Sequence, residues 1–295
     1  MSSIFKQSSH GALKLLEKLM GRGQLARAAR FVTNAVRLDV PNDMAQNGET
    51  LVVERVLQAH TGSRPLVILD CGANVGEYSL MVQRLAARVP PRIVALHSFE
   101  PSAWTFQRLR ENLDAAGLKK GVCLHQLALS DAPADAAVFQ VHRTGGGTNS
   151  LVQAGEAKGA GEEQVQVSTV DRFCEQQGIE TVDLLKIDTE GNDYNVLHGG
   201  QKMFAAGCIR VVQFEYNHRW IFASRFLRDA FELLGAWQYQ IGKVTPDGIE
   251  FYREWHPELE KFVEGNYIAC REETKTLFPQ IVWWGDLVNI PPVKT

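Results

Sequence analysis

Short apolar runs alternate with amphipathic stretches along most of the chain. The run "VILDC" has no polar residue before Asp70, which predicts a strand buried on both faces. Gly72 and Gly76 follow it and permit a tight turn, and from Tyr78 apolar residues recur at helical spacing until Pro90. A strand, a glycine turn and a helix in this order predict the first unit of a doubly wound nucleotide-binding sheet. A turn whose glycines serve packing alone is the alternative.

The same alternation continues toward the C-terminus. Four more strands are predicted, within "RIVALHSFEPS", "VCLHQLALSD", "VDLLKIDTEG" and "CIRVVQFEYN". The extended segments "AVFQVH" and "EQVQVSTVD" flank residues 143–163, which are rich in Gly and small polar residues and predict a mobile loop. The last strands are joined by turns too short for a helical crossover, which predicts an antiparallel end to a parallel sheet. The fold class is therefore α/β, with helices on both faces of a mostly parallel sheet.

Composition divides the chain into three predicted segments. Residues 1–43 form a basic amphipathic helical segment, because residues 1–37 hold seven Lys or Arg, one acid and an apolar stripe at helical spacing. Packing on the domain, weak contact with an anionic membrane surface and an organelle import signal are all open explanations for it. Residues 44–273 form the main domain, and residues 274–295, with two adjacent tryptophans, form an irregular C-terminal strap.

Overall composition excludes several classes of protein. The 295 residues are 45% hydrophobic and carry a formal net charge of −3, which supports a full core and gives no general attraction to nucleic acid. No apolar run approaches the ~20 residues of a membrane span, and no secretory signal is visible. The five cysteines are scattered, which indicates neither a zinc site nor a disulfide framework. A cytoplasmic setting is expected, and the oligomeric state is left open.

Acidic residues end three of the predicted strands. Asp70, Glu100 and Asp188 should meet in one crevice, because the carboxyl ends of parallel strands share one edge of the sheet. Such a crevice favours a cationic ligand that carries a ribose, whose hydroxyls Glu100 is placed to bind. S-adenosylmethionine fits these charges better than NAD does, and "GANVG" lacks the full glycine fingerprint of a pyrophosphate site.

Several motifs occur together in a recognisable order. They are "VILDCGANVGEYSL", "HSFEPSAWTFQRLRENL", "STVDRFC", "DLLKIDTEGNDYNVLHGG", "VVQFEYN" and "NYIA". From about Asn47 to Ala269 the sequence resembles the FkbM family of S-adenosylmethionine-dependent methyltransferases. The resemblance implies a seven-stranded class I methyltransferase fold, Rossmann-like, with an antiparallel last strand. It also implies methyl transfer to a hydroxyl of a small-molecule, glycan or lipid acceptor, such as a sugar, a glycolipid or a secondary metabolite.

The resemblance also implies a set of cofactor-binding residues. Glu100 should hold the ribose, Pro101 and Ser102 should flank it, and Asp188 should lie beside the sulfonium. Asp131 is a weaker candidate for the adenine amino group. The remaining expected cofactor contacts are Asn47, Glu49, Asp70, Gly72, Ala73, Asn74, Gly76, Tyr78, Ala128 and Leu129.

The general base is left open among three residues. Asp188, Glu190 and His218 are the candidates, because an acceptor alcohol must lose a proton. His218 is a candidate because imidazole is the side chain suited to proton transfer near neutral pH, although a solvent-exposed loop histidine explains it equally well. Glu190 is also explained as an acid in the first turn of a helix. No metal is expected, although Asp188, Glu190 and Glu215 offer a minor alternative as magnesium ligands.

Acceptor recognition is assigned to segments outside the cofactor motifs. The candidate substrate contacts are Asn149, Ser150 and Asn217. Two other functions remain as alternatives: a nicotinamide-dependent oxidoreductase, and a non-catalytic interaction protein with a methyltransferase fold.

Overall fold

The chain forms two compact units, residues 1–41 and residues 42–295. The computed structural model describes residues 3–39, 43–44, 46–61, 64–89, 94–118, 120–141, 149–152 and 161–281. The first unit consists of helices α1 (Ser3–Met20) and α2 (Arg22–Val36), with Gly21 at positive φ between them. Of the described helices, none combines the length and the hydrophobicity that crossing a bilayer requires.

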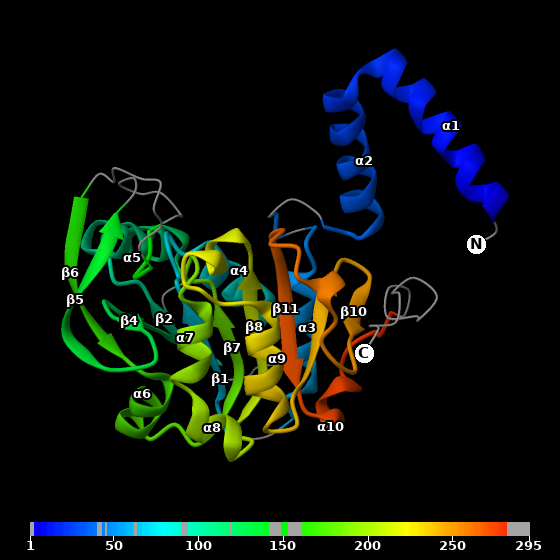
Figure 1. The fold of residues 1–295 in the computed structure, drawn as a ribbon. Helices are drawn as coiled ribbons and strands as arrows, with labels where there is room; N and C mark the ends of the chain where they lie inside the picture. The colour runs from blue at the N-terminus through cyan, green and yellow to red at the C-terminus, as the bar shows by residue number, and fades with distance from the viewer. Residues whose placement is uncertain are drawn as a thin grey trace. The chain divides into compact units, whose positions relative to one another are not determined.

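An eight-stranded sheet forms the centre of the second unit (Figure 1). Its strand order is β10-β9-β11-β8-β7-β1-β2-β3. The bounds of these strands are β1 Leu66–Cys71, β2 Val94–Phe99, β3 Val122–His125, β7 Val182–Ile187, β8 Ile209–Tyr216, β9 Gln240–Thr245, β10 Gly248–Phe251 and β11 Gly265–Cys270. The helical segments are α3 Glu49–Ala59, α4 Glu77–Ala86, α5 Ala103–Ala116, α6 Val170–Gln177, α7 Asp193–His198, α8 Gln201–Ala205, η1 His218–Ile221, α9 Leu227–Gly235, η2 Pro257–Leu259 and α10 Glu272–Lys275.

Strand directions confirm the predicted fold class and change the strand count. Strands β1, β2, β3, β7 and β8 are parallel, and β11 is antiparallel to both β8 and β9. The last strand is therefore reversed, as predicted. The sheet has eight strands rather than seven, because the Pro-Asp-Gly turn after Thr245 folds β10 back onto β9 as an antiparallel edge.

Part of the C-terminal segment lies along this edge. The backbone N–H of Ile249 donates to the carbonyl of Pro279 at 2.8 Å, and Ile281 N–H donates to the carbonyl of Ile249 at 3.0 Å. A tail paired in this way protects the exposed edge of β10. The rest of the predicted strap, residues 282–295, lies outside the described residues.

A second sheet, absent from the sequence prediction, has the order β4-β6-β5. Its strands are β4 (Ala128–Leu129), β5 (Ala134–Val141) and β6 (Gly161–Ser168). The segment "VCLHQLALSD" was expected to be one strand, but β3 leaves the main sheet at His125 and β4 pairs with β6 instead. Figure 1 shows this sheet at the end of the unit opposite β10.

The predicted mobile loop, residues 143–163, is mostly outside the described residues. Its last three residues, 161–163, belong to β6, which corrects the predicted boundary. Ser150 is also ordered, because it forms a bridge with Gln140 on β5.

Helices cover both faces of the main sheet. On one face α3 and α4 pack through Val52, Leu57 and Val82 against strand residues such as Leu184. On the other face α6, α7, α8 and α9 pack against a cluster that includes Leu185. Strand β7 lies at the centre and is buried along its whole length. A fully buried parallel strand of this kind holds the residues at its carboxyl end rigidly.

The turn after β1 depends on a glycine at Gly72. Its φ is +88°, and a Cβ built there lies 1.8 Å from the carbonyl oxygen of Asp188. Gly117 also has a positive φ, +66°, but a Cβ there has no neighbour within 4 Å. Gly117 is therefore a matched control for the cost of backbone strain alone.

We expect Gly117→Ala to lower the free energy of unfolding by about 1–2 kcal/mol, the strain of a left-handed residue. Gly72→Ala should cost a further ~1–3 kcal/mol, because the backbone of the Asp188 turn must move. Urea unfolding of both variants measures the difference. Equal destabilisation by the two substitutions would show that the close contact between the two turns has no energetic importance.

Candidate active site

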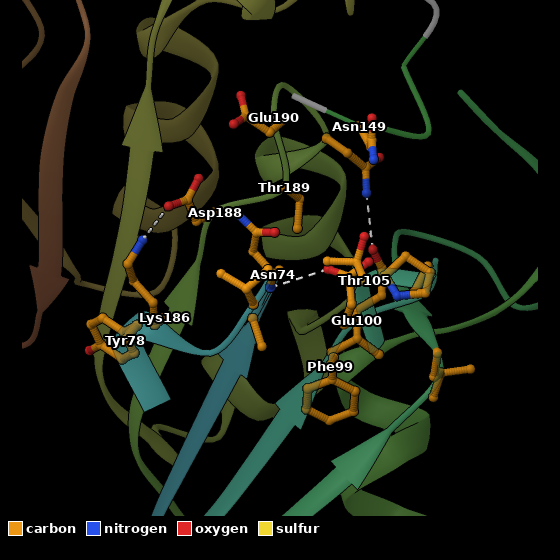
Figure 2. Close-up of a pocket in the computed structure, with 18 of the residues that line it drawn as sticks. Asn74, Tyr78, Phe99, Glu100, Thr105, Asn149, Lys186, Asp188, Thr189 and Glu190 are labelled. Carbon is orange, nitrogen blue, oxygen red and sulfur yellow. Dashed lines mark hydrogen bonds and ion pairs between the residues drawn. The ribbon is translucent and has the colours of Figure 1, made fainter. Parts of the chain in front are cut away.

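A cavity of about 230 Å³ opens at the carboxyl ends of β1, β2 and β7 (Figure 2). Its wall combines three turns of the main sheet with parts of the second sheet. The lining residues are Met44, Glu49, Gly72, Ala73, Asn74, Val75, Glu77, Tyr78, Phe99, Glu100, Pro101, Thr105, Leu127, Ala128, Leu129, Phe139, Asn149, Leu151, Lys186, Asp188, Thr189, Glu190 and Asn192. The predicted crevice is thus present at the expected edge of the sheet.

Glu100 is held in place by the backbone of two turns. Its Oε2 accepts the N–H of Asn74 at 3.2 Å, and its Oε1 accepts the N–H of Ser102 at 3.0 Å. Burial raises the pKa of Glu100 to about 7, although these two N–H groups act in the opposite direction. The carboxyl group is therefore fixed in orientation on the cavity wall, with further acceptor capacity on each oxygen.

Asp70 lies beneath the turn and is not part of the cavity wall. Its Oδ2 accepts a hydrogen bond of 2.6 Å from Ser79 Oγ, and the side chain is buried. Burial raises the pKa of Asp70 to about 6. Above it, the N–H groups of Gly72 and Ala73 both donate to the carbonyl of Phe99, which joins the ends of β1 and β2. Asp70 thus contributes to the turn that forms the cavity floor.

Lys186 is a buried cation on the cavity wall that the sequence analysis overlooked. Its Nζ lies 3.1 Å from Asp188 Oδ2 and 3.4 Å from Glu49 Oε1, and 5.6 Å from the ring centre of Tyr78. Burial opposes the charge, but the carboxylates of Asp188 and Glu49 raise the pKa of Lys186 well above its usual range. Figure 2 shows Lys186 directed toward Asp188. A single basic residue inside the apolar run "VDLLKI" was the signal that could have revealed it.

The turn "DTEG" after β7 forms the opposite rim of the cavity. Glu190 has a positive φ of 57°, uncommon for a residue with a side chain, and pairs with Arg219 of η1. Burial and the nearby charge of Asp188 raise the pKa of Glu190 to about 8. The turn is held by Asp193, whose carboxylate accepts the N–H groups of Thr189 and Gly191. The two acids on this rim therefore have different partners: Asp188 pairs with Lys186, and Glu190 pairs with Arg219.

Apolar side chains line the part of the cavity next to the second sheet. Phe99, Leu127 and Leu129 come from the β2 and β4 region, and Phe139 and Leu151 come from the second sheet and the segment that bridges to it. Phe139 and Leu151 were not predicted, because the second sheet was not. Apolar walls of this kind suit an aromatic base such as adenine.

The other predicted site residues divide by position. Ala128 and Pro101 line the cavity, while Gly76 does not line it and lies against Leu109 at the start of α4. Asn47 is buried and donates from Nδ2 to Glu49 Oε2 at 2.9 Å, so it contacts the cavity wall from behind. Asp131 is exposed and does not line the cavity.

The residues predicted to contact the acceptor differ in their position relative to the cavity. Asn149 lines the cavity on the side of Glu100 (Figure 2). Ser150 is buried, and its Oγ donates to the carbonyl of Thr189 at 3.0 Å, which ties its segment to the "DTEG" turn. Asn217 is buried and donates from Nδ2 to Glu215 at 2.5 Å. His218 is exposed at the start of η1 and does not line the cavity.

Carboxylates do not gather into a metal site in the described part of the chain. No group of three or more His, Cys, Asp or Glu side chains there has the arrangement needed to hold a metal ion. Asp188, Glu190 and Glu215, the minor alternative for magnesium, are therefore not such a group.

Four buried polar atoms on the cavity wall lack a hydrogen-bond partner among the described residues. They are Asn74 Oδ1, Tyr78 OH, Thr105 Oγ1 and Thr189 Oγ1. An unsatisfied buried polar atom is costly, so these atoms indicate the place of a polar ligand. Together with the Glu100 carboxylate and the apolar pocket, they fit a nucleoside with a charged amino-acid tail.

The sheet order and the position of the cavity are those of the class I methyltransferase fold. In that fold a reversed strand, here β11, lies between two strands that run in the common direction, and the cofactor lies at the strand ends. The chain belongs to the FkbM methyltransferase family, because the model of the methyltransferase FkbM domain matches residues 70–241. The cofactor is therefore S-adenosylmethionine, as the sequence predicts.

Solved structures similar to this chain are also methyltransferases. A methyltransferase FkbM from Methylobacillus flagellatus KT is 14% identical, with a TM-score of 0.44, 73% of this chain covered and 47% of that one. A SAM-dependent methyltransferase from Agrobacterium tumefaciens is 11% identical, with a TM-score of 0.40 and coverages of 75% and 60%. A putative methyltransferase from Streptococcus mutans, in complex with SAH, is 8% identical, with a TM-score of 0.41 and coverages of 75% and 96%.

This chain thus spans about half the length of the first of these structures. A search of curated proteins finds no match to the sequence. The family assignment rests on the domain match alone.

Removal of the Lys186 charge should destabilise the protein. We expect Lys186→Met to lower the free energy of unfolding by about 3–5 kcal/mol, because Glu49 and Asp188 lose their buried partner. Adding Glu49→Gln should restore part of the loss, since one uncompensated charge is then removed. Urea unfolding of the single and double variants tests this. A Lys186→Met protein as stable as the wild type would refute the importance of the ion pairs.

Proposed function

We propose that this chain transfers a methyl group from S-adenosylmethionine to a hydroxyl group of a small-molecule, glycan or lipid acceptor. The observation that carries the proposal is the Glu100 carboxyl group, oriented by two backbone N–H groups on the wall of a cavity with unsatisfied polar atoms. The sugar, glycolipid or secondary-metabolite character of the acceptor comes from the family resemblance.

The residues present suit each part of the cofactor. Glu100 would accept hydrogen bonds from the ribose hydroxyls, and Phe139 and Leu129 would contact the adenine. Asn74 Oδ1 and the Asp188 carboxylate would bind the positively charged methionine end. When bound, S-adenosylmethionine supplies an electrophilic methyl group for an in-line displacement, in which alignment of the reactants provides much of the rate.

Glu190 is the best candidate for the general base. It lines the cavity, and a pKa of about 8 is close to the value that suits proton transfer near neutral pH. Its carboxylate would take the proton of the acceptor hydroxyl, and Arg219 would hold the side chain in place. Asp188 is less suited, because its carboxylate is already paired with the ammonium group of Lys186.

The alternative function, a nicotinamide-dependent oxidoreductase, fits the cavity less well. It would need a backbone cradle for a pyrophosphate, and the cavity rim instead carries carboxylates: Glu49, Glu77, Asp188 and Glu190. These negative charges would repel a pyrophosphate.

Cofactor affinity should depend on the ionised form of Glu100. We expect Glu100→Ala to weaken the binding of S-adenosylmethionine by about 1.5–3 kcal/mol, the range for hydrogen bonds to charged groups. In the wild type the affinity should increase as the pH rises through about 7, because the carboxylate then accepts both ribose hydroxyls. Calorimetry between pH 6 and 8 measures both effects.

Glu100→Gln is the matched control for this measurement. It keeps the shape of the side chain but should lose the pH dependence. NAD should not bind to either protein. Tighter binding of NAD than of S-adenosylmethionine would overturn the proposed function.

Turnover should reveal which residue is the base. With an acceptor identified by incubating the protein, labelled S-adenosylmethionine and cell extract, Glu190→Gln should lower turnover about 10²-fold and leave cofactor affinity nearly unchanged. Wild-type turnover should increase as the pH rises through about 8, because only the ionised carboxylate accepts a proton. Steady-state rates measured across this pH range test the increase in turnover.

The control variants separate the three candidates. Asp188→Asn should weaken cofactor binding, and His218→Ala should behave like the wild type because His218 is exposed outside the cavity. Loss of the pH dependence in His218→Ala, with normal turnover in Glu190→Gln, would assign the role to the histidine instead.

A further inference from the structure

The N-terminal unit exposes apolar side chains along both of its helices. On α1 these are Leu13, Leu15, Leu16, Leu19 and Met20, and on α2 they are Phe31, Val32 and Val36. Leu19 and Phe31 are each 74% exposed. No residue from 11 to 36 is buried, so these helices have no core of their own. Helices of 15 and 18 residues are marginally stable in water without packing, so this unit needs a surface to cover its apolar side chains.

Each helix separates apolar and basic residues onto opposite faces. At 100° per residue, Leu15, Leu16 and Leu19 of α1 fall within one face, and Lys14 and Lys18 fall on the other. On α2, Val32 and Val36 share one face with Leu25, while Arg27 and Arg30 lie on the opposite side.

The charge of the unit is strongly one-sided. Residues 1–37 contain seven Lys or Arg and a single acid, Glu17, which pairs with Arg22. A second copy of the same unit would bring two such basic faces close together, which repulsion between like charges opposes. Residues 38–295 carry a net charge of −9, so packing on them is the rival arrangement that the experiment below separates from lipid binding. An anionic surface complements the basic faces, and its apolar interior complements the exposed leucines.

We infer that residues 3–39 form a helical hairpin that lies in the interface of an anionic lipid bilayer. The apolar faces of α1 and α2 enter the boundary between head groups and acyl chains, and the lysines and arginines contact the lipid phosphates. The helices lie on the membrane rather than cross it, which agrees with their low overall hydrophobicity. The inference is independent of the proposed methyl transfer.

Sedimentation of the full chain with lipid vesicles tests this inference. We expect binding to vesicles of phosphatidylcholine with phosphatidylglycerol, little binding to phosphatidylcholine alone, and a decrease as salt is added. Val32→Glu should weaken the binding about tenfold or more, because it places a charge on the apolar face that Val32 shares with Leu25 and Val36. Asn34→Glu is the matched control, since it adds the same charge to the same helix on the basic side, between Arg27 and Arg30, and it should weaken binding much less.

Other occupants of the apolar faces give different results. A wild-type dimer in solution that Val32→Glu dissociates, without vesicle binding, would assign these faces to a second copy and overturn the inference. A thermal transition of the whole chain that Val32→Glu lowers, again without vesicle binding, would assign them to packing on residues 42–295 and also overturn it. Equal loss of vesicle binding in both glutamate variants would overturn the role of the apolar face.

Discussion

The buried ammonium group of Lys186 is the contact on which the site depends. It joins Asp188 at the end of β7 to Glu49 at the start of α3, so one cation fixes two segments that are far apart in the sequence. A parallel strand buried on both faces ordinarily contains only apolar residues. A lysine in that position is tolerated because carboxylates surround it, and Glu49 and Asp188 each have its ammonium group as an ion-pair partner. The charged groups of the cavity wall are therefore paired with a residue that lies in the core of the sheet.

The second sheet gives the cavity its other wall. Glu163 on β6 accepts hydrogen bonds from Ser102 Oγ and from Ala103 N–H, both at 3.0 Å, and so caps the start of α5. The same loop carries Glu100. On the far side, Ser150 donates to the turn after β7. The second sheet is thus attached to both rims of the cavity, and its position controls the width between the ribose carboxylate and the acids of the "DTEG" turn.

Local patterns in the sequence were sufficient for the fold class and for part of the site. Apolar runs that end at Glu100 and Asp188 predicted the sheet edge, because strand direction alone brings such residues together. Contacts between distant segments could not be predicted in the same way. The start of α5 illustrates this: the hydroxyl of Ser102, the residue before the helix, donates to Glu163, 61 residues away. Phe139 was missed for the same reason, since only tertiary packing gives it its role, whereas Lys186 was marked by its position as a lone lysine in an apolar run.

Pairing and burial also change the charge that the sequence suggests for the crevice. Counting strand-end acids predicts three carboxylates that repel one another until a cationic ligand arrives. In the structure Asp188 is paired with Lys186, and burial raises the pKa of Asp70 to about 6 and of Glu100 to about 7. An acid whose pKa is higher in the folded chain than in the unfolded chain holds its proton more tightly when folded.

The contribution of such an acid to the stability of the fold is therefore greatest at low pH. It is lost as the pH rises from about 4 toward the raised pKa values of Asp70 and Glu100. At neutral pH these carboxyl groups reduce the stability of the fold, and a cationic ligand that favours their ionised forms would offset part of that cost. The site is held ready for its ligand by the surrounding structure, in particular by Lys186 and by the backbone N–H groups around Glu100.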